Sequence, residues 1–145
     1  MIRRNISFAA KRKTTWLESD SMLLASKAIE RIADHATRIA RSVGMLGDSR
    51  VDGDTMKALE QLGGEASSIM DRSVEALFKR DSTLANDCIE RTAVLREKAD
   101  AFLDETMKRR GRVAVGLAFV IESIERTGGY SSDIAEIAIN LAEGQ

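Results

Sequence analysis

The sequence predicts an all-α protein, built as an antiparallel bundle of four long helices. The 145-residue chain contains no proline and only 4% aromatic residues. It is rich in Ala, Leu, Glu and Arg, which are strong helix formers. Apolar residues recur at the spacing of one helix face in four stretches, which glycines and capping residues separate. A chain of this length can bury a real core, and long helices joined by short loops pack as antiparallel neighbours.

The first helix is expected over residues 17–43, where the apolar residues form one stripe. The residues predicted to face inward are Leu24, Ala25, Ala28, Ile29, Ile32, Ala36, Ile39 and Val43. Ahead of this helix, the first thirteen residues carry five positive charges and no acid. We interpret residues 1–16 as a basic, solvated N-terminal arm and residues 17–145 as the helical bundle.

Three further helices are expected over residues 55–79, from the 81–83 cluster of capping residues to about 110, and over 113–142. Asp54 is the predicted N-cap of the first of these three. Paired glycines fall inside two of them. Because glycine in a helix interior costs about 1 kcal/mol relative to alanine, we expect Gly63-Gly64 to be a weak point and Gly128-Gly129 to interrupt the last helix.

Charge and composition exclude several classes of protein. A net charge of −1 provides no basic field for nucleic acid. Cys88 is the only cysteine, which excludes an intramolecular disulfide and indicates a small buried hydrophobe in a reducing compartment. The longest apolar run, 113–121, is too short to span a bilayer, and the N-terminus lacks the apolar core of a signal peptide. We therefore predict a cytoplasmic protein that is peripheral to a membrane at most.

The most informative feature is a segment, 29–41, that nearly recurs 95 residues later as 124–136. Both copies begin with Ile-Glu-Arg and carry Ile-Ala ten residues further on. The triplet alone is weak evidence, since it occurs a third time at 89–91, so the longer register carries the argument. Both copies lie in strongly helical sequence, and the repeat therefore predicts two structurally related helices.

Acidic side chains are the chemistry of the repeat. Glu30 and Asp34 are one helical turn apart on one face, and together they can ligate a hard or borderline cation such as Fe, Zn, Mn or Mg, with water at the other positions. The alternative is an ordinary solvated face with local ion pairs. In the second copy Gly129 stands in the position of Asp34. Glu125 remains, but Asp133 lies two turns from it, roughly 12 Å along the axis and too far to share one ion.

The acidic stripe of the second copy has another interpretation, which is helix pairing. Where the second copy has Asp133 and Glu136, the first has Arg38 and Arg41. If the two helices face each other, these side chains are complementary charges that set the register of packing. The only histidine, His35, has no Glu-x-x-His partner, so the pattern of di-iron carboxylate bundles is absent.

Residues 28–36 resemble the signature helix of the PhoU family of phosphate-uptake regulators, and 124–126 with 133–136 resemble its second copy. The resemblance covers most of the chain, from about residue 16 to the end. It implies two related three-helix bundles with the signature on the third helix of each, so this chain resembles the last four helices. It also implies metal binding through Glu/Asp-x-x-x-Asp motifs. The candidate metal ligands are Glu30, Asp34, Glu125 and Asp133, although Gly129 replaces the second motif aspartate.

Three functions are compatible with these observations. The resemblance implies a non-enzymatic, cytoplasmic negative regulator that binds a phosphate ABC transporter component or a phosphate-signalling protein. The alternatives are a metal-dependent helical enzyme, which needs more ligands and a substrate pocket than the sequence supplies, and a purely structural bundle. We expect a homodimer or higher oligomer, because the apolar stripe of the first helix must be buried against the fourth helix or a second chain.

Overall fold

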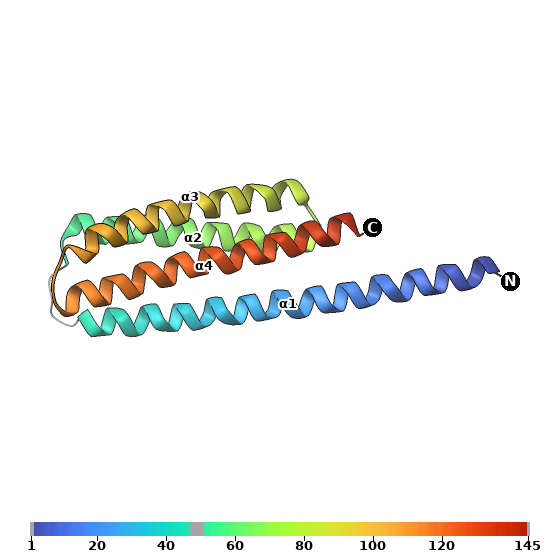
Figure 1. Cartoon of the computed structure of the whole chain (residues 1–145), viewed down its shortest axis with the longest axis horizontal. Coiled ribbons are helices and arrows are strands. Elements are labelled where there is room, and N and C mark those ends of the chain that lie inside the picture. Colours follow the sequence, from blue (N-terminus) through green and yellow to red (C-terminus); the bar gives the residue numbers. More distant parts are fainter. Residues whose placement is uncertain (1, 47–50, 145) are drawn as a thin grey trace.

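The computed structural model describes residues 2–46 and 51–144, with the side chains of 2–15 and 17 outside that description. No strand occurs in this part of the chain, and the predicted all-α fold of four long helices is confirmed. Successive helices run in opposite directions along the molecule (Figure 1). The helices are α1 (Ile2–Leu46), α2 (Gly53–Lys79), α3 (Ser82–Met107) and α4 (Arg112–Glu143).

The first helix is longer than its apolar stripe. The expected start near residue 17 was wrong, because α1 already begins at Ile2. Residues 2–16 contain neither glycine nor proline, and nothing in their backbone chemistry stops a helix. This part of α1 extends well past the end of α4, away from the other helices (Figure 1). The basic segment is therefore a continuation of α1, and its separation from the bundle as an arm stays a prediction.

Aspartates cap α2 and α3. Asp52, not Asp54, is the N-cap of α2, since its carboxylate accepts hydrogen bonds from the Thr55 N–H at 2.8 Å and the Thr55 hydroxyl at 2.9 Å. These bonds, with one from Arg109, lower the pKa of Asp52 to about 2. Asp81 caps α3 in the predicted capping cluster by accepting from the Leu84 N–H at 3.0 Å. Both helices therefore begin where a side chain satisfies free backbone donors.

The core belongs mainly to α2, α3 and α4. α4 packs against all three other helices, whereas α1 packs against α4 alone. The largest fully buried apolar side chains come from the three-helix unit of α2, α3 and α4, and Cys88 is buried with them as predicted. They are Ile69, Leu95, Leu117, Ile121 and Ile134. The fold is a three-helix bundle with α1 laid along the outside of its last helix.

The paired glycines do not interrupt their helices, so the expected break at Gly128-Gly129 was wrong. α2 is continuous through 63–64 and α4 is continuous through 128–129. A Cβ at Gly128 would lie only 2.4 Å from Cδ2 of the fully buried Leu95. Gly128 is thus explained by the close approach of α3 to α4, which offsets its low helix propensity.

Candidate functional site

The two copies of the repeat pack against each other around His35 of α1 and Tyr130 of α4, which occupy matched positions in the repeat. Their ring centroids are 5.8 Å apart. On one side of this contact Arg38 forms an ion pair with Glu122 at 3.2 Å. On the other side their repeat equivalents, Asp133 and Lys27, line one shared hollow. The antiparallel pair of α1 and α4 therefore has an approximate two-fold axis near the His35–Tyr130 contact.

This arrangement corrects the predicted pairing of charges. Arg38 was expected opposite Asp133 and Glu136, but it pairs with Glu122 and also lies 4.9 Å from the centre of the Phe119 ring. The two helices run antiparallel, so a residue that follows His35 in α1 meets a residue that precedes Tyr130 in α4. Arg38 follows His35 and therefore meets Glu122, whereas Asp133 and Glu136 follow Tyr130. Arg41, the second predicted partner, is exposed and forms no ion pair with another described residue.

His35 lies half-buried at the centre of the α1–α4 contact. Burial, and next the positive charge of Arg38, lower the pKa of His35 below its usual value, while Glu122 acts in the opposite direction. Its Nδ1 atom is buried and has no hydrogen-bond partner among the described residues. The imidazole is therefore held neutral at neutral pH, as a packing partner of Tyr130.

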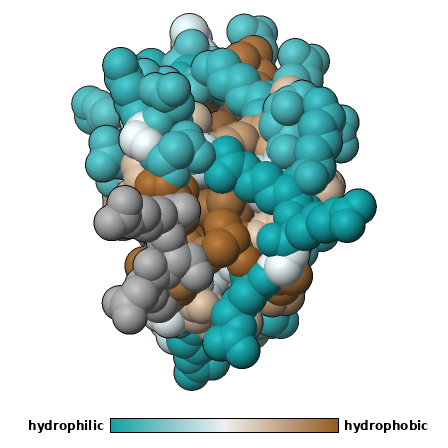
Figure 2. Space-filling model, turned by 90° about the vertical axis from the view of Figure 1, so that its left-hand side faces the viewer, coloured by the Kyte–Doolittle hydropathy of each residue, from teal (hydrophilic) through white to brown (hydrophobic). Residues whose placement is uncertain are grey.

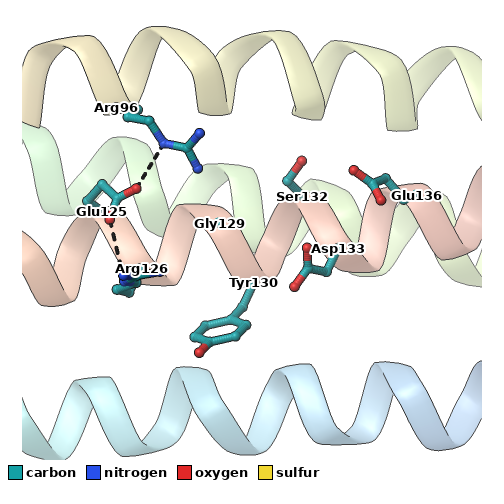
Figure 3. A pocket seen from close by; sticks show the side chains of 8 residues that line it. All are labelled: Arg96, Glu125, Arg126, Gly129, Tyr130, Ser132, Asp133 and Glu136. Atoms are coloured by element: carbon teal, nitrogen blue, oxygen red, sulfur yellow. Dashed lines mark hydrogen bonds and ion pairs between the residues drawn. The ribbon is translucent and has the colours of Figure 1, made fainter.

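A polar hollow of about 290 Å³ lies on α4 beside α3. Figure 3 shows Glu125 between two guanidinium groups: Arg96 Nε donates to it at 3.0 Å, and Arg126 Nε lies 3.8 Å away. Tyr130 and Asp133 point toward α1, whereas Glu125 and Arg96 bridge α4 and α3 (Figure 3). The charges of this hollow largely compensate one another, so its evident role is to tie α3 to α4.

The four candidate metal ligands lie on two helices. Glu30 and Asp34 are exposed and stand two positions on either side of the buried Ile32, about 160° round the helix from it, so they face away from α4. Glu125 and Asp133 are on α4. Among the described residues, no three side chains of His, Cys, Asp or Glu gather as a metal-binding group.

The residues fit a metal ion unequally. Glu30 and Asp34 present two free carboxylates one turn apart, which fits half of a coordination shell completed by water or another chain. Glu125 is already neutralised by Arg96 and Arg126, so it does not fit a ligand of the same kind. Glu125 and Asp133 line the same polar hollow. Metal binding stays a prediction for both copies.

The repeat also reveals a surface that the sequence analysis missed. Seven positions of α4 form the face buried against α2 and α3: Leu117, Ile121, Ile124, Gly128, Ser131, Ala135 and Ala138. Their repeat equivalents in α1 are all exposed: Met22, Ser26, Ile29, Ala33, Ala36, Ala40 and Val43. We call these seven residues the open face of α1. The repeat could have identified this face from the sequence, because each of its residues lies 95 positions before a residue of the apolar stripe of α4.

The open face borders an apolar groove of about 620 Å³ between α1 and α2, with α4 as its floor. The α1 side includes Ile29, Ile32, Ala36 and Val43, and the α2 side includes Leu59, Gly63 and Met70. Seen from the end where α1 stops and α2 begins, hydrophobic surface is visible between the polar side chains (Figure 2). Of the predicted inward stripe, Ala25, Ala28 and Ile32 are buried, but Leu24, Ile29, Ala36 and Val43 are exposed because α1 meets only α4.

Comparison with known proteins identifies the family. The sequence model described as the PhoU domain matches residues 59–138, more than half of the chain. The chain belongs to the PhoU family. The match begins inside α2 and covers α3 and most of α4, so it contains most of the three-helix unit and the second copy of the repeat. No curated protein and no solved structure matched the chain. None of the helices in the described residues is long and apolar enough to cross a membrane.

Proposed function

We propose that this PhoU-family protein is a cytoplasmic negative regulator of phosphate uptake that acts by binding a component of a phosphate ABC transporter or a phosphate-signalling protein. The observation that carries the proposal is the PhoU-domain match over 59–138, which supports a role in phosphate homeostasis. The geometry supports action by contact, because an apolar groove of about 620 Å³ is open between α1 and α2, and helices or loops of other proteins bind in grooves of this kind.

The exposed apolar surface supports the same mode of action. Trp16, Leu23, Leu24 and Phe78 are more than half exposed in addition to the groove. Large exposed apolar side chains together with an apolar groove are typical of surfaces that bind other proteins. The polar hollow around Glu125 contains compensated ion pairs, so nothing there favours the alternative of a metal-dependent enzyme.

Metal binding is a second, separable part of the proposal. Glu30 and Asp34 would hold the ion through carboxylate oxygens, and the bound ion would fix the charge of the outward face of α1. Glu30 and Asp34 are the only pair of candidate ligands one turn apart on a shared face, which is the support for assigning the ion to the first copy.

A deletion strain tests the regulatory role. Loss of the gene is expected to raise phosphate uptake and phosphate-starvation transcription in phosphate-rich medium, and the wild-type gene to restore both. Binding of the purified chain to the purified transporter ATPase and to the purified phosphate-signalling protein, each assayed alone, identifies the partner. Unchanged uptake and transcription in the deletion strain, with no binding to either protein, would contradict the proposal.

A further inference from the structure

The first part of α1 concentrates positive charge at one end of the molecule. The helix is continuous from Ile2, and its N-terminal part extends past the end of α4, away from the other helices (Figure 1). Five basic residues and no acid occur among the first thirteen residues, although the net charge of the whole chain is −1. A helix rises 1.5 Å per residue, so these charges are spread over only about 15 Å of its length. We call residues 2–16 the basic segment.

The basic segment has the sequence pattern of an amphipathic helix. At 100° per residue, four of its residues fall within one sector of about 80°, namely Ile2, Ile6, Ala9 and Trp16. Four of the five basic residues fall outside this sector. The fifth is Lys13, and a lysine can reach the polar headgroups of a membrane along its apolar stem. An apolar sector beside a strongly basic one is typical of helices that lie in the surface of an anionic membrane.

Two large aromatic side chains are exposed where the basic segment meets the bundle. Trp16 is 66% exposed and Phe78 is 75% exposed. Glu18 joins α1 to Arg80, the C-cap residue of α2, at 2.6 Å, and each aromatic residue stands two positions before one member of this ion pair. The carboxylate of Glu18 is neutralised by Arg80, so it does not offset the charge of the basic segment. Exposed aromatic residues next to basic ones serve as anchors at the headgroup level of a membrane.

We propose that this end of the molecule binds the surface of an anionic lipid membrane, with the basic segment along the headgroups and Trp16 and Phe78 inserted between them. A membrane is favoured over nucleic acid because Phe78 lies outside the basic segment and adds apolar rather than basic surface. The proposal does not rest on the regulatory function. Vesicles contain no protein partner, so a failure of membrane binding is distinguishable from a failure of the deletion strain to change phosphate uptake.

The fluorescence of Trp16 tests the proposal directly, because it is the only tryptophan of the chain. Vesicles of equal parts of phosphatidylcholine and phosphatidylglycerol are expected to shift its emission to shorter wavelength, as the indole leaves water. Vesicles of phosphatidylcholine alone are expected to leave the emission unchanged. Salt at about 1 M is expected to reverse the shift, since charges are then screened beyond about 3 Å.

A charge reversal tests the basic segment. Lys11→Glu with Arg12→Glu is expected to weaken cosedimentation with the anionic vesicles at least roughly 30-fold, because each basic residue near such a surface contributes about fivefold. The matched control is Arg110→Glu with Arg112→Glu, which changes the net charge equally. Both control residues are exposed at the connection of α3 to α4, at the other end of the bundle (Figure 1), and this variant is expected to bind as the wild type does.

A second pair of variants tests the aromatic anchor. Phe78→Ser is expected to weaken vesicle binding roughly 10-fold, whereas Met107→Ser, which removes a 64% exposed side chain at the end of α3, is expected to change nothing. Unchanged Trp16 emission with anionic vesicles would overturn the proposal, as would equal binding by the charge reversal and its control. Binding of the wild type to a DNA duplex without binding to vesicles would overturn it as well.

Discussion

The two helices that carry the repeat meet different surroundings. α4 is enclosed by α1, α2 and α3, and the face containing Ile124 and Ser131 is buried. α1 packs along α4 and otherwise touches only Arg80, the C-cap residue of α2, through Glu18 at 2.6 Å among the described residues, and the equivalent face containing Ile29 and Ala36 is exposed. Similar apolar patterns therefore give a core in one helix and a surface in the other. The comparison teaches that periodicity specifies which face of a helix can be buried, while the neighbouring helices decide whether it is.

The strongest test of the comparison is a matched pair of truncations. Ile124→Ala is expected to destabilise the fold by about 2–4 kcal/mol, because it removes buried apolar contacts where α4 forms the floor of the groove. Ile29→Ala, at the equivalent position of α1, is expected to cost under about 1 kcal/mol in dilute protein, since the side chain is already partly in water. Urea unfolding at low protein concentration measures both. Similar losses for the two variants would show that α1 is as enclosed as α4.

A second pair of variants concerns Gly128 and Ala33, which occupy the same position of the repeat, and gives each helix the residue of the other. Gly128→Ala is expected to destabilise by roughly 1–3 kcal/mol, because its Cβ would lie 2.4 Å from Cδ2 of Leu95. Ala33→Gly is expected to cost only about 1 kcal/mol, the difference in helix propensity on an exposed face. Thermal unfolding measures the loss of stability of each variant. A neutral or stabilising Gly128→Ala would mean that α3 and α4 are not in close contact there.

The sequence predicted the class of fold well because that class depends on local patterns. No proline and four apolar stripes give four helices, and the Asp81 cluster gives the start of α3. The start of α1 could not be predicted from its stripe, since a helix without breakers continues beyond its apolar contacts. The role of Gly128 also needed the structure, because only the position of Leu95 shows why a side chain is excluded.

The candidate site was predicted less completely. The repeat identified α1 and α4 as a related pair, and the spacing of Glu30 and Asp34 correctly put them on one face. Pairing of Arg38 with Glu122 depends on the direction and offset of the two helices, which sequence spacing does not specify. Likewise, Arg96 neutralises Glu125 from α3, a contact between residues with no local relation in the chain.

The two copies are also expected to differ in metal binding. Asp34→Asn is expected to remove most metal that copurifies with the protein, because it leaves Glu30 without its neighbouring ligand. Glu125→Gln is expected to change the metal content little, since Glu125 already accepts from Arg96. Elemental analysis of the wild type and both variants measures this difference. Equal metal content in the wild type and Asp34→Asn would refute the site.

The smallest expected effect concerns pH, at the centre of the α1–α4 contact. Because burial and Arg38 lower the pKa of His35, the unfolded chain binds a proton more readily than the fold. The contribution of neutral His35 to the free energy of unfolding is complete above the pKa of about 6.5 that histidine has in the unfolded chain. This contribution is lost as the pH falls toward the lower pKa of the folded state. His35→Tyr introduces the residue that the second copy carries at this position. The variant is expected to show a smaller change of melting temperature with pH between about pH 7.5 and 5.5 than the wild type. An unchanged slope would contradict the assignment.

The most direct measurement of the difference between the two helices is thiol labelling of Ala36→Cys and Ser131→Cys, which are matched positions of the repeat. In dilute protein, the thiol introduced at residue 36 is expected to react about as fast as in an unfolded peptide, and the one at 131 to be protected by the core. Cys88 is buried and serves as an internal reference. As the protein concentration rises, labelling at 36 is expected to slow while labelling at 131 stays constant. Equal rates at 36 and 131 in dilute protein would contradict the account.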